Sequence, residues 1–377
     1  MVSKMNEIII RPVVSKKDEK IFLLFPYKVI YKDDKNWATP LYQDRKKLID
    51  KNKNPFYKHA DAEFYIAEKN GVIVGRIGAI VNFNHNKEHN DKIGFFGFFE
   101  CINDQQVANK LFDKAKEFLL ARGLTQMRGP ANPSVNDEYG LLINAFDKPA
   151  VVMMTYNPDY YLSLIENYGF KKEKDLFAYL IKKETVFTEK FLRVSKLLKK
   201  RNSVSIRTME MKNFNNEVEE IKKIYNIAWA KNWGAIPMTE DEINLMAKDL
   251  KPIVVPELVL FAERNGKTIG FSLSIPDVNI ALKFNKSGNL LTGLYHLLTK
   301  KKKIDLVRVV VLGVLPEYQT SGVAALLFYE SAQNAMKLGY NFGEASWILE
   351  DNLMMNRAAE ALKGERYKTY RIYQMDI

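Results

Sequence analysis

Cysteine, histidine and long apolar runs are all scarce in this chain of 377 residues. A single cysteine, Cys101, cannot form a disulfide within the chain, so we expect a protein of the reducing cytoplasm. One cysteine and four histidines offer too few soft ligands for a structural zinc site, and we predict no metal. His85 and His89 lie in a polar stretch, where we expect solvated side chains.

No apolar run reaches the ~18 residues that a membrane-spanning helix needs. The first residues, Met-Val-Ser-Lys-Met-Asn-Glu, contain no apolar signal core. We therefore expect neither a membrane span nor secretion through a signal peptide. What is present is an ordinary globular composition, 47% hydrophobic and 27% charged, in a chain long enough for two domains.

Positive charge is in excess, with 57 basic and 45 acidic residues and a net charge of +12. Such an excess is compatible with nucleic acid, anionic lipid or a phosphorylated cofactor, and equally with a solvated lysine-rich surface. The basic residues are scattered, and neither a helix-turn-helix nor a zinc-finger spacing accompanies them. Nucleic acid is therefore not an expected partner.

The periodicity of the apolar residues predicts the same order of strands and helices twice. Each half contains a hairpin that turns at Asn-Gly, at 70–71 and at 265–266, because a type I′ turn needs positive φ at both central positions. Each then continues with a strand, an amphipathic helix and another strand. The pattern predicts two α/β domains, residues 1–185 and 204–377, joined by a basic linker over residues 186–203.

One segment of the second half, Val314–Leu327, has a pattern that indicates chemistry. A β-branched strand leads into a Pro-Glu-Tyr turn and then into a loop of small residues that opens a helix. Backbone N–H groups at such a helix start can bind a pyrophosphate, and a glycine lets the anion approach closely. A tight turn without a ligand would use similar residues. The loop consists of Gln319, Thr320, Ser321, Gly322, Val323 and Ala324.

This segment resembles the cofactor loop of the GNAT acyltransferase superfamily, Arg/Gln-x-x-Gly-x-Gly/Ala after a Val-x-Pro-Glu-Tyr turn. The resemblance implies the α/β (α+β) class, with two tandem GNAT-like domains, each a mixed, mostly antiparallel central sheet flanked by helices. Acetyl-CoA or a longer acyl-CoA is the implied co-substrate. The corresponding loop of the first half, Cys101–Ala108, has no glycine, so we expect coenzyme A in the second half. A second similar motif, residues 345–362, implies that Asn356 helps to hold the pantetheine arm.

The implied reaction is direct attack of an amine on the acyl-CoA thioester in a ternary complex. It needs an oxyanion donor for the carbonyl, a base for the ammonium and a proton for the leaving thiolate. We expect the strand that precedes the cofactor loop to diverge from its neighbour and to offer its backbone to the thioester. The residues concerned are Leu312, Gly313 and Val314.

Two carboxylates are candidates for the base. Glu350 lies at the end of the following strand and is the preferred candidate, with Glu344 second. Either one could also be a simple surface carboxylate. The superfamily often has a tyrosine as the acid where this sequence has Lys363, so Tyr367 is the substitute.

Two further stretches are candidates for binding the acceptor. One is a polar loop with Asn132, Asn136 and Glu138, and the other contains Trp233 between two predicted helices. A turn-rich connection would use the same residue types. Together with Gly94–Glu100 these stretches resemble a group of bacterial tandem GNAT proteins, for which transfer to an amine is implied and a long-chain, sphingoid-type amine is one suggestion. The alternative is a non-catalytic protein that binds coenzyme A or another ligand and keeps the fold.

An apolar and basic segment, residues 280–304, is inserted where the superfamily usually has a short link, and it ends in Lys300–Lys303. Such a segment can lie on an anionic membrane, where each nearby lysine contributes about 1 kcal/mol. It could equally pack its leucines on the core. The first interpretation would place a cytoplasmic protein at the inner face of the membrane. The sequence leaves the oligomeric state open.

Overall fold

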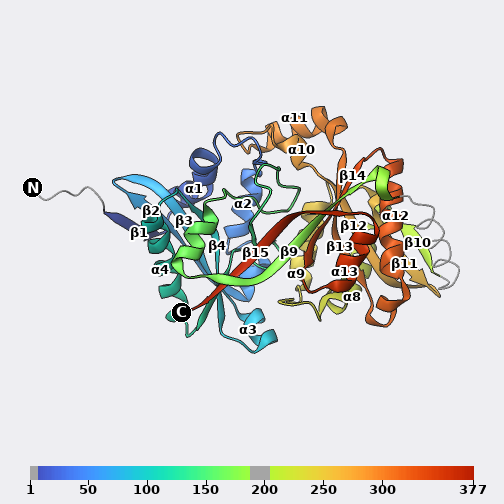
Figure 1. Ribbon diagram of the computed structural model, residues 1–377, viewed down its shortest axis with the longest axis horizontal. Helices are drawn as coiled ribbons and strands as arrows, with labels where there is room; N and C mark the ends of the chain where they lie inside the picture. The colour runs from blue at the N-terminus through green and yellow to red at the C-terminus, as the bar shows by residue number, and fades with distance from the viewer. Residues whose placement is uncertain (1–6, 187–203) are drawn as a thin grey trace, which may run out of the picture. The chain divides into compact units, whose positions relative to one another are not determined.

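The computed structural model describes residues 7–186 and 204–377, which form two compact units (Figure 1). The first unit combines Met1–Asp175 with Ala281–Thr299 and Thr369–Ile377, and the second combines Leu176–Ile280 with Lys300–Lys368. The predicted domains were contiguous, whereas each unit is assembled from separate chain segments. The predicted linker lies, apart from Val186, outside the described residues.

The first unit is built on a mostly antiparallel sheet, as predicted. Its strands β1 to β4 pair antiparallel in chain order, β4 pairs parallel with β5, and β5 pairs antiparallel with the last part of β15. Positive φ at Asn70 and Gly71 confirms the predicted hairpin turn. The strands are β1 (Ile8–Pro12), β2 (Ala60–Lys69), β3 (Val72–Asn82), β4 (Ile93–Cys101), β5 (Gln126–Gly129), β6 (Ala131–Asn132), β7 (Glu138–Tyr139), β8 (Leu141–Leu142) and β15 (Glu365–Asp376).

Helices cover both faces of this sheet. On one face α4 buries Leu111 and Ala115 in a core that also contains Ile77 of β3. The neighbouring Arg76 points to the other face, because side chains alternate along a strand, and it donates to the backbone oxygen of Phe22 in α1 at 2.8 Å. The α-helices are α1 (Lys16–Phe25), α2 (Tyr42–Ile49), α3 (Phe83–His89), α4 (Gln105–Leu120), α5 (Tyr161–Tyr168) and α11 (Leu290–Lys300).

The prediction that His85 has a solvated side chain is wrong. Residues 83–89 form α3, in which the Asn82 side chain caps the first turn and the His85 side chain is only 2% exposed. His85 packs edge-on against Phe95 with ring centroids 4.9 Å apart. Burial lowers the pKa of His85 to about 3, so its imidazole is neutral at physiological pH.

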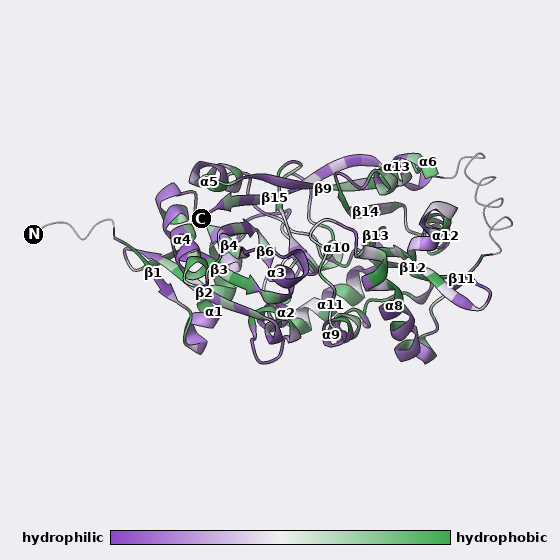
Figure 2. Cartoon of the chain, turned by 90° about the horizontal axis from the view of Figure 1, so that it is seen from below, coloured by the Kyte–Doolittle hydropathy of each residue, from purple (hydrophilic) through white to green (hydrophobic). Residues whose placement is uncertain are grey.

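The second unit has the same kind of sheet. Its strands lie in the order β9, β14, β13, β12, β11, β10, and only the β13–β14 pair is parallel. In Figure 2 the strand β3 of the first unit carries a hydrophobic stretch. The strands are β9 (Lys171–Lys182), β10 (Ser205–Thr208), β11 (Val259–Arg264), β12 (Lys267–Pro276), β13 (Leu306–Val314) and β14 (Phe342–Leu349).

Helices again lie on both faces of the second sheet. Val314 packs with Leu327 of α12, whereas a side chain at the adjacent Gly313 would meet Ala228 of α8, so α12 and α8 cover opposite faces. Both β9 and β15 contribute residues to each unit. The α-helices are α6 (Lys183–Val186), α8 (Phe214–Trp229), α9 (Glu240–Leu250), α10 (Asn279–Leu282), α12 (Val323–Lys337) and α13 (Leu353–Ala361).

Candidate active site

The two parallel strands of the second unit separate partway along their length. β13 and β14 pair only over 306–309 and 342–345. Just beyond the last pair, the register of β13 against β12 shifts, which leaves Val310 as the extra residue of a bulge. Because a bulge bends its strand, β13 leaves β14 here, and the two strands open into a V.

The predicted cofactor segment lies along and beyond the open part of β13. Leu312, Gly313 and Val314 pair with β12 and no longer pair with β14. The indole of Trp229, at the end of α8, donates to the Leu312 carbonyl at 3.3 Å. The strand expected to diverge from its neighbour therefore does so at these residues.

The predicted phosphate loop forms a helical turn, Pro316–Ser321, followed by Gly322 at a φ of 86° and by α12. No side chain caps α12, and its first intrahelical bond runs from the Leu326 N–H to the Gly322 carbonyl. The N–H groups in the first turn of α12 have no carbonyl partner within the helix, and they lie in the positive field of the helix start, where an anion can bind. Gln319 holds the loop against β13 through a 3.2 Å bond to the Val314 carbonyl.

A buried polar network lies at the base of the V. The Glu344 carboxylate, fully buried, accepts hydrogen bonds from the Ser346 hydroxyl and from the Tyr367 phenol. Arg308 donates to the Ser346 hydroxyl at 3.0 Å and to its carbonyl at 3.1 Å. Arg308 and Glu344 are register partners one step before the last pair, so the bulge keeps this network at the point where the strands separate.

This network brings together two residues singled out in the sequence and two that were not. Tyr367 and Glu344 were candidates for acid and base, and they are in direct contact. Arg308 and Ser346 were missed, because nothing in the sequence shows that β13 and β14 place them side by side. Glu350 lies in the turn after β14, and its backbone carbonyl accepts from Asn356 at 3.4 Å.

Asn356 sits near the start of α13 and is held by protein groups. Its amide nitrogen donates to the carbonyls of Leu349 at 2.9 Å and Asn352 at 3.0 Å, and its side-chain oxygen accepts from the Tyr179 phenol at 3.0 Å. These bonds tie the helix to the end of β14. A role toward the pantetheine arm stays a prediction.

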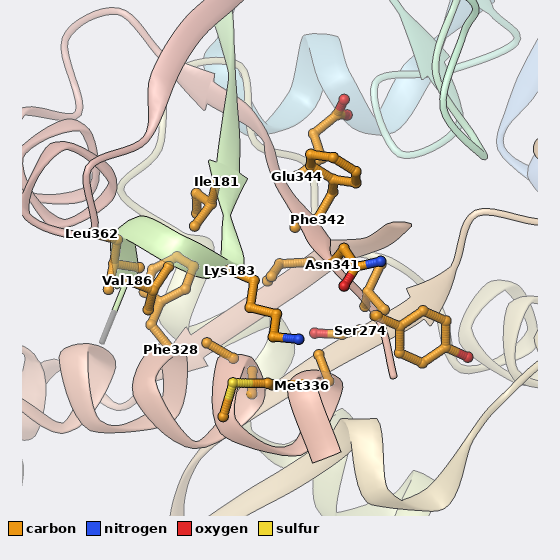
Figure 3. A pocket seen from close by; sticks show the side chains of 17 residues that line it. Ile181, Lys183, Val186, Ser274, Phe328, Met336, Asn341, Phe342, Glu344 and Leu362 are labelled. Carbon is orange, nitrogen blue, oxygen red and sulfur yellow. The ribbon is translucent and has the colours of Figure 1, made fainter. Parts of the chain in front are cut away.

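A small cavity of about 60 Å³ lies on the α12 face of the same strands (Figure 3). Its walls are mainly apolar and include Val309, the last residue before the bulge, and Phe328 of α12. Figure 3 shows the Glu344 carboxylate pointing away from this cavity. The apolar cavity and the polar network therefore lie on opposite faces of β14.

The first unit repeats the bulge but closes the opening. Its parallel strands end at the pair Phe95–Arg128, and β4 shifts register between Gly97 and Glu100. The space beyond is occupied by Ala131 and Asn132. The Asn132 side chain accepts from the Phe98 N–H at 2.5 Å, which occupies backbone that a pantetheine arm would need.

The acceptor-binding candidates of the first unit are engaged with protein groups. Glu138 forms a two-pronged ion pair with Arg45 of α2, at 2.5 and 2.7 Å, and accepts from Asn132 at 3.3 Å. The Asn136 N–H donates to the Ser134 hydroxyl. Trp233 of the second unit lies in the turns between α8 and α9. Their binding roles stay predictions, and Arg45 was missed because no motif surrounds it.

Comparison with known proteins gives the family. No family model matches the chain. It is 36% identical over 373 residues to "Bacterial ceramide synthase" of Caulobacter vibrioides (strain NA1000 / CB15N), covering 96% of each protein. It is 33% identical to "Protein YghO" of Escherichia coli (strain K12), covering 98% of this chain and 95% of that one. A tandem GNAT protein from the clavulanic acid biosynthesis pathway matches in fold over 98% of each chain, with a TM-score of 0.57 at 9% identity.

The chain belongs to the family of the bacterial ceramide synthase, and its fold is that of tandem GNAT proteins. The predicted fold class and N-acyltransferase activity are thereby confirmed for this tandem GNAT protein. Within residues 7–186 and 204–377, no three histidine, cysteine or carboxylate side chains are grouped as a metal would require. No helix in the same part of the chain is both long and apolar enough to cross a bilayer.

The closed opening of the first unit generates a prediction about Gly97. A Cβ atom there would lie 1.7 Å from the Ala131 carbonyl oxygen, so Gly97→Ala must displace backbone. We expect a loss of about 3 kcal/mol in the free energy of unfolding, the upper end of the usual cost of overpacking. Urea denaturation followed by circular dichroism measures it.

Gly343→Ala is the matched control, because this strand glycine has only one atom, 3.8 Å away, near the same position. We expect its stability to stay within about 1 kcal/mol of the parent. Equal stability of the two variants would contradict the close approach of Ala131 to β4.

Proposed function

We propose that this tandem GNAT protein transfers an acyl group from acyl-CoA to the amine of a long-chain, sphingoid-type acceptor. The observation that carries the chemistry is the network of Arg308, Ser346, Glu344 and Tyr367 at the point where β13 leaves β14. The relative named a ceramide synthase, similar over nearly its whole length, supports the choice of acceptor.

The residues of the second unit fit coenzyme A. The free N–H groups at the start of α12 would bind the pyrophosphate, with Gly322 leaving room for it. The backbone of Leu312–Val314, which is not paired with β14, would run beside the pantetheine arm. An N–H group near the bulge would donate to the thioester oxygen as negative charge develops on it.

The network would supply the proton transfers. Glu344 takes the proton that the attacking ammonium must lose, so that the neutral nitrogen can form its bond to the thioester carbon. The carbon–sulfur bond then breaks, and Tyr367 gives its proton to the departing thiolate. Because Glu344 and Tyr367 are hydrogen-bonded, the carboxyl group can return its proton to the phenolate. The bonded nitrogen loses its second proton to solvent as the amide forms. The balance is an ammonium ion and a thioester converted to an amide, a thiol and one released proton.

Arg308 acts in this scheme as a positioning residue. It reaches Glu344 through the Ser346 hydroxyl, which accepts from Arg308 and donates to the carboxylate. The chain of bonds orients the carboxylate toward Tyr367.

The proton scheme predicts the effect of removing each group. Glu344→Gln and Tyr367→Phe should each lower kcat by about 10²–10⁴, the usual contribution of a positioned acid or base. Coenzyme A affinity should change little, because neither side chain lies in the phosphate loop. Release of the thiol, followed with a chromogenic disulfide, gives kcat, and calorimetry gives the affinity.

Glu350→Gln is the comparison that decides between the two carboxylates. We expect nearly full turnover from it, because Glu350 lies in the turn after β14 and not on the paired part of the strand beside Arg308. A large loss in Glu350→Gln with normal turnover in Glu344→Gln would move the base to Glu350.

The phosphate loop can be tested with two glycines at opposite ends of α12. Gly322 and Gly339 both have positive φ, 86° and 91°, so a side chain strains each equally. Gly322→Glu places a carboxylate where the pyrophosphate would bind, and we expect its dissociation constant for coenzyme A to rise at least about tenfold, or 1.4 kcal/mol. Gly339→Glu should leave that constant within about twofold. Equal constants in a calorimetric titration would refute the assignment of the loop.

The acceptor is tested with matched amines. With palmitoyl-CoA as donor, we expect kcat/KM for a long-chain sphingoid amine to exceed that for ethanolamine by at least about 10², because the long chain adds binding energy that the short amine lacks. The readout is mass-spectrometric detection of the amide. Equal values for the two amines would refute the lipid acceptor and leave the acyltransferase chemistry in place.

A further inference from the structure

An apolar stripe is exposed along helix α11. Leu291, Leu294, Tyr295 and Leu298 are 75%, 47%, 62% and 80% exposed. Their spacing of three, one and three residues places them on one side of the helix. In Figure 2 the hydrophobic colour of α11 reflects its many leucines. We call these four residues the α11 face.

The opposite side of α11 is fixed to the first unit. A Cβ atom at the buried Gly293 would lie 2.8 Å from the Leu41 side chain. In the preceding loop the Tyr42 N–H donates to the Gly288 carbonyl at 2.9 Å, and Gly288 lies against the ring of Tyr27. These close approaches hold the helix in place, so its apolar side chains are presented to solvent by a fixed backbone.

The chain segment that carries the α11 face has charged residues of only one sign. Residues 278–304 contain six lysines and neither aspartate nor glutamate. Lys283 and Lys286 precede the helix, and Lys300–Lys303 form its end and the turn that follows it in the chain. A second copy of this chain, docked face to face, would bring two sets of these lysines together, and like charges repel. A partner surface with an apolar interior and negative charges at its boundary with water would complement both the exposed apolar side chains and the flanking lysines.

We propose that the α11 face docks on a bilayer that contains anionic phospholipid. The leucines and Tyr295 enter the boundary between headgroups and acyl chains, and the flanking lysines lie among the phosphates. The same chain segment that completes the first unit thereby becomes its membrane contact. This proposal stands whichever amine the enzyme acylates.

Vesicle sedimentation of the full chain tests it. Vesicles of phosphatidylcholine that contain about 30% phosphatidylglycerol should bind the protein at least about tenfold more tightly than vesicles of pure phosphatidylcholine. Leu291→Glu with Leu298→Glu should weaken that binding at least about tenfold, because two carboxylates replace the most exposed apolar contacts. Raising the salt concentration should weaken the binding of the parent protein.

The matched control is Val14→Glu with Val72→Glu, which adds the same charge at exposed apolar positions outside the α11 face, 82% and 62% exposed. We expect its vesicle binding to stay within about threefold of the parent. This small loss measures how much the two added negative charges weaken binding when the α11 face is intact. Circular dichroism checks that both double variants are folded.

Equal vesicle binding by the two double variants would overturn the proposal. The proposal would also be overturned if the parent protein bound neither kind of vesicle. The same holds if the parent protein formed a dimer and the Leu291→Glu, Leu298→Glu variant were a monomer. Because the readout is sedimentation, a failure here leaves the proposed acyl transfer untouched, and a failure of acyl transfer leaves this result untouched.

Discussion

The extra residue at Val310 is the constraint on which the site depends. Parallel strands that kept pairing would cover each other's backbone, and neither could serve a ligand. The bulge ends the pairing after Val309 and Ala345, which frees one side of β13 while the other side stays fixed to β12. It also places the register pair Arg308 and Glu344 one step before the point where the strands separate. A polar network of this kind is tolerable in a buried place because its members satisfy one another.

The two units show what the same bulge does when the next few residues differ. In the first unit the chain after β5 folds back, so that Ala131 and Asn132 occupy the opening and the Asn132 side chain accepts from the Phe98 N–H. In the second unit β14 continues and pairs with β9. One arrangement leaves part of β13 unpaired with β14, where we propose that the cofactor binds. The other fills the equivalent place with internal packing, with an Arg45–Glu138 ion pair nearby. Repeated architecture therefore does not imply repeated function.

Much of the fold could be predicted because its signals are local. Asn-Gly turns, the α4 periodicity and the loop from Gln319 to Ala324 depend on neighbours in the chain, and the sheet class follows from the resulting order of elements. The contact of Tyr367 with Glu344 depends on strand register, which no local pattern encodes. Residues 83–89 were too polar to indicate the helix that buries His85. The return of residues 281–299 to the first unit is equally non-local.

That return, together with the use of the last nine residues by the first unit, has a consequence for how the chain reaches its native state. On the ribosome the first unit lacks an edge strand of its sheet and the α11 segment until residues of the second unit have been synthesised. Neither half can be cut out at a single point and expressed as a finished module. Although each unit has its own core, we expect the two units to fold together, to be degraded together and to be inherited as one piece when genes recombine.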